Sequence, residues 1–131
     1  MSNKLDKILA EISAGELIDK ITILEIKNLK ITDKDKLKEV NKELISLNKT
    51  LNDVIKTDEK IIQFKEDLKN TNLKLWDIEN SKRSAEKNHK FDSEFIKLAR
   101  DVYKLNDQRA KIKLNINNFL GSNLKEVKSH D

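Results

Sequence analysis

The chain has 131 residues, of which 38% are charged, and it contains no proline, no cysteine and only two glycines. A sandwich or barrel needs many tight turns, so this shortage of turn-forming residues favours long helices in a single domain, residues 1–131. The lack of cysteine removes disulfide and thiolate chemistry and fits a reducing compartment. No stretch reaches the roughly 18 uninterrupted apolar residues of a membrane span, and acids interrupt the apolar N-terminus. We therefore expect neither a membrane span nor a signal peptide, and a cytoplasmic location.

The net charge of +4 is weak support for nucleic-acid binding. Lysines and acids alternate along the whole length and do not gather into a basic block, as is typical of solvated helix faces. We therefore predict no nucleic-acid partner.

A lead-in, residues 1–12, precedes the first regular pattern of the chain. Its apolar positions are compatible with a short helix or with an extended stretch. These positions are Leu5, Ile8, Leu9 and Ile12.

The first predicted helix covers about residues 14–31. Ser13 and Glu16 have the spacing of a capping box, in which the serine oxygen and the glutamate satisfy free backbone amides at a helix start. The helix is apolar on most sides, so several other helices should cover it. Its apolar residues are Leu17, Ile18, Ile21, Ile23, Leu24, Ile26, Leu29 and Ile31.

The second and third predicted helices, about residues 34–56 and 59–87, carry apolar seams with steps of three and four residues. Such steps average 3.5 residues, so these seams should supercoil left-handedly against partner helices. The stretch TDKD at 32–35 contains the cap of the second helix. Thr57 and Asp58 are the cap candidates for the third.

The fourth predicted helix, about residues 92–120, starts at Asp92, with Phe91 packed onto its first turns. Gly121 is its expected C-terminal stop, and residues 122–131 form a tail. A charged residue, Arg109, occupies a position of its apolar seam where leucine would pack. The seam consists of Phe95, Leu98, Val102, Leu105, Arg109, Ile112, Ile116 and Phe119.

Short connections force neighbouring helices to run antiparallel, so the predicted fold is an all-α antiparallel bundle of about four helices with coiled-coil-like hairpins. Folding the chain about residues 32, 57 and 90 puts Leu24 near Asn41, Asn41 near Leu73, and Leu73 near residues 104–106. The first helix is the shortest, so one end of the bundle should be thin. An exposed apolar seam at that end would favour a homodimer.

Most of the unusual polar and aromatic side chains converge on one level of this predicted bundle. Arg109 there either pairs with a carboxylate and fixes the helix register, which we favour, or lines a cavity for a small anion. Its candidate carboxylate partners are Glu25, Asp107 and Glu79, in that order. The candidate ligand-binding residues are Lys20, Glu25, Trp76, Glu79, Arg100, Tyr103, Asn106, Asp107 and Arg109.

We identify no catalytic residue, no metal site and no cofactor site. The sequence has no phosphate-binding glycine loop and neither an HExxH nor a GxSxG motif. Glu86 and His89 form a single ExxH, whereas helical di-iron sites need two such pairs and two further glutamates. The stretch ELIDKITILEIK is faintly similar to the first helix of all-helical chorismate mutases. That fold normally supplies more arginines than the three present here.

Three motifs resemble those of a family of small bacterial and phage proteins catalogued as a domain of unknown function. They are SxGELIDKITILEIK from residue 13, LWxIE from residue 75 and VYxxNDxRA from residue 102. The resemblance covers residues 13–31, 73–83 and 95–129 and implies no established activity. Some relatives are loosely labelled as linked to lipopolysaccharide biosynthesis. Relatives tend to finish with Lys-Ser-Tyr, where this chain has KSH.

The sequence thus predicts a non-enzymatic binding or protein-interaction module, homodimeric and serving a cell-envelope or phage-related process. Its partner would be an unknown protein or a small anionic ligand. The alternative is a small-anion-binding protein, or a helical enzyme similar to chorismate mutase, that uses the polar cluster inside the bundle.

Overall fold

The computed structural model describes residues 4–128, and four α-helices account for 76% of them. The helices are α1 (Ala14–Lys30), α2 (Lys34–Val54), α3 (Glu59–Lys87) and α4 (Ser93–Leu120). Their ends differ from the predicted ones by at most two residues. The predicted all-α bundle is confirmed. Ser129 and His130 of the KSH ending lie outside the described residues.

Each helix starts at a side chain that accepts a hydrogen bond from a free backbone amide of the first turn. Of the two candidates for the start of α3, Asp58 fills the position. The rings of Phe91 and Phe95 lie 5.3 Å apart at the start of α4, as the staple prediction requires. Gly121 ends α4 with a φ of 63°, a conformation that glycine adopts without steric cost. The four starting residues are Ser13, Asp33, Asp58 and Asp92.

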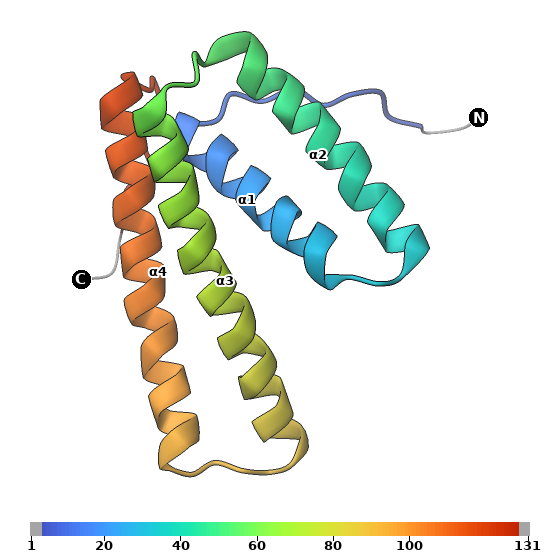
Figure 1. Cartoon of the computed structure of the whole chain (residues 1–131), viewed down its shortest axis with the longest axis vertical. Helices are drawn as coiled ribbons and strands as arrows, with labels where there is room; N and C mark the ends of the chain where they lie inside the picture. Colours follow the sequence, from blue (N-terminus) through green and yellow to red (C-terminus); the bar gives the residue numbers. More distant parts are fainter. Residues whose placement is uncertain (1–3, 129–131) are drawn as a thin grey trace.

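Helix α1 is the centre of the fold (Figure 1). It packs against α2, α3 and α4, whereas α2 packs along α1 alone, so α1 joins two hairpins. A helix with neighbours on three sides must be apolar on most sides, and this explains the composition of α1. The main core cluster lies where α1 meets the start of α3 and the end of α4. It consists of Leu17, Ile18, Ile21, Leu51, Ile61, Leu68 and Ile116.

The predicted position of α2 beside α3 is wrong. Folding the chain back at residue 57 put Asn41 near Leu73, but α2 and α3 do not pack along each other. Figure 1 shows α2 diverging from α3 at their connection and lying along α1 instead. Asn41 is exposed to solvent. The seam of α2 required a partner helix, and its periodicity could not specify which helix that is.

The hairpin of α3 and α4 extends well beyond α1 (Figure 1). Residues 80–100, called the open end below, form no hydrogen bond or ion pair with the described residues of α1 or α2. The structure therefore has the thin end that the short first helix predicted. No helix within residues 4–128 is both long and apolar enough to cross a membrane.

Candidate functional site

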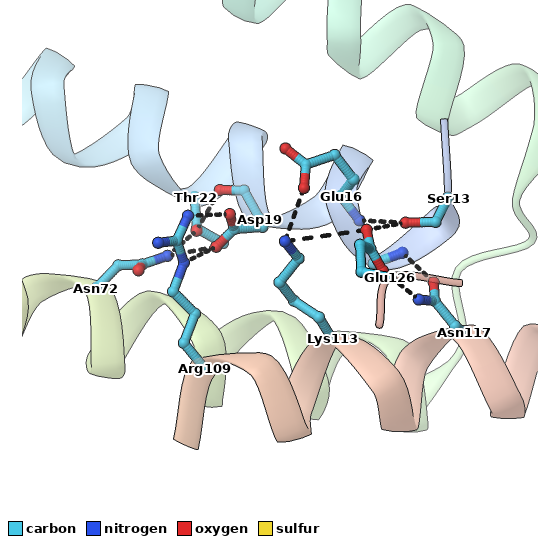
Figure 2. Close-up of polar contacts among 10 residues, drawn as sticks. Ser13, Glu16, Asp19, Thr22, Asn72, Arg109, Lys113, Asn117 and Glu126 are labelled. Carbon is cyan, nitrogen blue, oxygen red and sulfur yellow. Dashed lines mark hydrogen bonds and ion pairs between the residues drawn. The ribbon is translucent and has the colours of Figure 1, made fainter. Parts of the chain in front are cut away.

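Arg109 of α4 points at Asp19 of α1 inside the fold (Figure 2). Its Nε donates to one carboxylate oxygen at 2.9 Å and its Nη2 donates to the other at 2.5 Å. Two parallel bonds of this kind fit the flat guanidinium group and fix its orientation. Asp19 is completely buried, whereas the Arg109 side chain keeps 30% of its exposure. The hydrogen bond to Asp19 raises the pKa of Arg109 above its ordinary value.

Asn72 and Thr22 complete the surroundings of the buried carboxylate. The Asn72 amide donates to Asp19 Oδ1 at 2.9 Å and to Thr22 Oγ1 at 3.0 Å. Thr22 Oγ1 in turn donates to the backbone carbonyl of Asp19 at 2.7 Å. Within the described residues, no buried side-chain nitrogen or oxygen lacks a partner. A fully satisfied polar cluster of this kind holds α1 in register with α3 and α4.

The predicted carboxylate partner of Arg109 was wrong, because the ranking omitted Asp19. The three ranked acids pair with lysines closer to solvent, where an ion pair contributes little. These pairs are Glu25 with Lys65 and Lys69, Asp107 with Lys128, and Glu79 with Lys82.

A signal in the sequence could have identified Asp19. Four residues of α1 follow one another by steps of four, three and four, which places them on one helix face. All four are buried, and three of them are too small or too polar for an ordinary core face. They are Gly15, Asp19, Thr22 and Ile26.

A second polar cluster, called the clasp below, joins the start of α1 to the end of α4 and to the segment after it (Figure 2). Ser13 Oγ accepts from the backbone amide of Glu16 at 3.0 Å, as the capping-box spacing predicted. The Glu16 carboxylate accepts instead from Lys113 Nζ of α4 at 2.7 Å. The clasp consists of Ser13, Gly15, Glu16, Lys113, Asn117, Ser122 and Glu126.

Glu126 ties the segment after α4 into the clasp. Its carboxylate accepts hydrogen bonds from Ser13 Oγ and from Asn117 Nδ2, the latter at 2.7 Å. Burial alone would raise the pKa of Glu126, but these bonds and the charge of Lys113 lower it below 4.5. Residues 122–128 are thus part of the scaffold, although the sequence suggested a simple tail.

Gly15 allows α1 to approach α4 closely at the clasp. Its backbone N donates to Asn117 Oδ1 at 2.7 Å. A Cβ at this position would lie 2.6 Å from the backbone oxygen of Lys113, which cannot move independently of its helix. Only glycine fits such a contact. The first motif of the sequence therefore has a structural explanation in Ser13, Gly15 and Asp19.

A groove with a volume of about 480 Å³ opens beside the Asp19–Arg109 pair. It lies between α3, α4 and the second half of α1, and it combines an apolar base with a polar rim, as binding sites commonly do. The apolar residues are Ile23, Ile26, Leu75, Trp76 and Val102. The polar residues are the buried Asn72 and, on the rim, Glu79, Asn80, Arg83, Asn106 and Arg109.

The structure brings four of the nine candidate ligand-binding residues together in this groove. These four are Trp76, Glu79, Asn106 and Arg109. Asn80 and Arg83 also belong to the groove and were not selected from the sequence. Their signal is their spacing from Trp76, since residues four and seven positions later share its helix face. The candidates that do not line the groove are Lys20, Glu25, Arg100, Tyr103 and Asp107.

The cations expected of an anion site are dispersed. Lys20 and Arg100 are exposed and lie outside the groove. The charge of Arg109 is compensated by Asp19, and Glu79 lies one turn before Arg83 on the rim. The groove is therefore close to electrically neutral. Within the described residues, no three His, Cys, Asp or Glu side chains gather where they could hold a metal ion.

Comparison with known proteins identifies the chain at the level of a family. No curated protein and no solved structure matches it. The bacterial and phage origin and the lipopolysaccharide label implied by the motifs remain predictions. One family model matches residues 8–131, which is nearly the whole chain. The chain thus belongs to the family described as "Family of unknown function (DUF6165)".

Proposed function

We propose that this chain is a non-enzymatic protein-interaction module whose docking face is the groove around Trp76. One observation carries the proposal: the only tryptophan of the chain lines an apolar groove where the α3–α4 hairpin emerges from under α1. Tryptophan is among the residues that contribute most to protein interfaces, above all in apolar pockets with polar rims. The Asp19–Arg109 pair and the clasp supply the rigid support that a preformed groove needs.

The apolar lining and the neutrality of the groove favour an amphipathic helix as the bound element. Two helices form the long walls, and helices commonly bind in such grooves through apolar residues at steps of three and four. The mixed charges of Glu79 and Arg83 fit a polar flank better than a single strongly charged ligand. The homodimer and the cytoplasmic location expected from the sequence remain part of this proposal.

Fluorescence of Trp76 tests the proposal without any label, because no other tryptophan is present. Amphipathic helical peptides with four apolar residues on one face should shift its emission to shorter wavelength in a saturable manner, since they exclude water from the groove. Peptides of the same composition with scrambled order are the matched control. A panel of helical peptides that leaves the emission unchanged would contradict the proposal.

Small-anion binding is the second candidate, and one detail of the groove favours it. Asp19 accepts hydrogen bonds from Nε and Nη2 of Arg109, and Nη1 makes no hydrogen bond within the described residues, so it can donate to an anion in the groove. Sugar phosphates, nucleotides and aromatic dicarboxylates should then raise the melting temperature saturably, because a ligand that binds only the native state stabilises it. The alternative of an enzyme similar to chorismate mutase is less well supported, because such a site needs further cations around the dicarboxylate. Lys20 and Arg100, the candidates for these cations, lie outside the groove.

A further inference from the structure

Asn72 lines the groove around Trp76, although only 6% of this residue is exposed. Its side-chain nitrogen donates inside the fold, to Asp19 Oδ1 at 2.9 Å and to Thr22 Oγ1 at 3.0 Å. The amide cannot turn over, because a carboxylate only accepts and the Thr22 hydroxyl already donates its proton to the Asp19 carbonyl. The side-chain oxygen of Asn72 is therefore held on the side away from these partners (Figure 2).

This oxygen of Asn72 has no hydrogen-bond partner within residues 4–128. It is nevertheless accessible, because every fully enclosed side-chain nitrogen or oxygen of the described residues has a partner. Asn72 lines the groove, so the oxygen opens into the groove. An acceptor that the fold holds in one direction needs no further ordering when a ligand binds it.

Arg109 supplies a donor next to this acceptor. Its Nε and the amide nitrogen of Asn72 donate to the same oxygen of Asp19, each at 2.9 Å, so the two side chains meet there (Figure 2). Nη1 of Arg109 makes no hydrogen bond within the described residues, and Arg109 also lines the groove. The groove thus offers an acceptor and a donor from neighbouring side chains, and Trp76 lies one helical turn after Asn72 on α3.

A carboxamide is the side-chain group that matches this pair. Its oxygen accepts from Arg109 while its nitrogen donates to Asn72, both from one planar group. A carboxylate has no proton for Asn72, and Asp19 already compensates the charge of Arg109. An apolar side chain would displace water from both atoms without replacing the hydrogen bonds, which lowers affinity. Among side chains, the pair therefore favours glutamine or asparagine.

We propose that the helix bound in the groove carries a glutamine or asparagine among its apolar residues, and that its carboxamide binds Asn72 and Arg109. The inference rests on the proposed function of the groove and names the side chain by which the groove recognises its partner. The apolar residues of the bound helix cover Trp76 and the apolar base. The carboxamide fixes the register of the helix along the groove, as a single buried asparagine does in coiled coils.

A glutamine scan of a bound peptide tests the proposal through the fluorescence of Trp76. The host is an amphipathic helical peptide without tryptophan that shifts the emission, and glutamine replaces each of its apolar residues in turn. Methionine and glutamate, which resemble glutamine in length, are placed at the same positions as controls. At one position, glutamine should bind about tenfold or more tightly than either control, the change expected when buried polar groups lose their partners.

Asn72→Leu tests whether Asn72 makes the contact. Leucine is similar in size but has no acceptor, so the preference for glutamine over methionine should largely disappear, while the methionine peptide binds at least as tightly as before. A change that only loosened the groove would weaken both peptides equally. Asn70→Leu, at an exposed position of α3 outside the groove, is the matched control and should keep the preference. Circular dichroism establishes that each variant is folded.

Nuclear magnetic resonance of the wild-type chain gives a second measurement that needs no variant. The side-chain amide signals of Asn72 should shift more with the glutamine peptide than with the methionine peptide, because only glutamine binds this amide group. Equal shifts with both peptides would contradict the contact, whether or not Asn72→Leu folds.

Two results of the peptide titrations would overturn the carboxamide contact. They are a scan in which glutamine nowhere binds more tightly than methionine, and a preference that Asn72→Leu leaves unchanged. Tighter binding of the glutamate peptide would also overturn it and would assign the pair to an anion. The docking role of the groove would survive all three results, since the peptides still shift the Trp76 emission. If no helical peptide shifts the emission, the docking role fails, and the carboxamide contact fails with it.

Discussion

The two ends of the α3–α4 hairpin are built differently. At one end, α4 is joined to α1 by the buried Asp19–Arg109 pair and by the clasp, where each buried polar side chain has a partner. At the other end, the open end, α3 and α4 pack only against each other (Figure 1). The motif residues Ser13, Gly15, Asp19 and Arg109 gather at the first end and explain the fold. A binding function is better sought between the two ends, where helix faces remain uncovered.

The largest expected effect is at the Asp19–Arg109 pair. Arg109→Met should lower the free energy of unfolding by about 3–5 kcal/mol, because it leaves a fully buried carboxylate without its cation. Replacing both residues, as Asp19→Leu with Arg109→Met, should recover most of this loss. Urea denaturation of the two single variants and the double variant measures the coupling. A small effect of the single change would mean that the pair does not fix the helix register.

The next effect concerns the close approach at Gly15. Gly15→Ala should lower the free energy of unfolding by about 1–3 kcal/mol, the usual cost of overpacking, even though alanine favours helices. Thermal denaturation measures this loss. Gly121→Ala is a useful comparison, because its Cβ meets no atom within 4 Å and only the positive φ opposes it. An unchanged or higher melting temperature for Gly15→Ala would show that the clasp is looser than described.

Glu126 should make the clasp sensitive to acid. Its pKa is lowered in the folded state, so its carboxylate stabilises the fold above pH 4.5, and this contribution is lost as the pH falls below that value. Glu126→Gln should therefore lower the melting temperature at neutral pH, with the difference from wild type shrinking in acid. Glu86→Gln, at an exposed glutamate of the open end, is the control and should differ little at any pH. A pH-independent effect at Glu126 would contradict the assignment.

The smallest effect is at the open end. His89, between α3 and α4, has a φ of 55°, a conformation that costs non-glycine residues about 1–2 kcal/mol. His89→Gly should therefore raise the melting temperature slightly, by less than Gly15→Ala lowers it, since glycine also gains freedom in the unfolded chain. Differential scanning calorimetry measures both changes. A decrease on His89→Gly would mean that the strain relieved at the positive φ is smaller than the cost of glycine's freedom in the unfolded chain.

The sequence predicted the helices well because their signals are local. Ser13, Asp58 and Asp92 start helices through bonds to backbone amides only three residues away. Gly121 stops α4 through its own backbone conformation. Such features depend on neighbouring residues alone, so they can be read before any tertiary structure is known.

The arrangement of the helices was harder to predict because it depends on contacts between distant segments. The seam of α2 indicated a partner, and only the structure shows that α1 alone provides it. If the chain is folded so that Leu24 lies beside residues 104–106, then Arg109 lies beside residue 20, next to Asp19. Glu25 was ranked first instead, although it pairs with lysines of α3. The groove was not predicted, in part because the positions of Asn80 and Arg83 become informative only when their spacing from Trp76 is considered.

Native-state hydrogen exchange of the full chain tests most directly whether the two ends differ as described. Backbone amides of α1 and of α4 around Lys113 and Asn117 should exchange only through global unfolding, because the clasp and the buried pair close this region. Amides of residues 84–98 in the open end should exchange through local opening, with protection lower by roughly tenfold or more. Equal protection at both ends would contradict the account, since it would mean that the open end is as firmly held as the clasp.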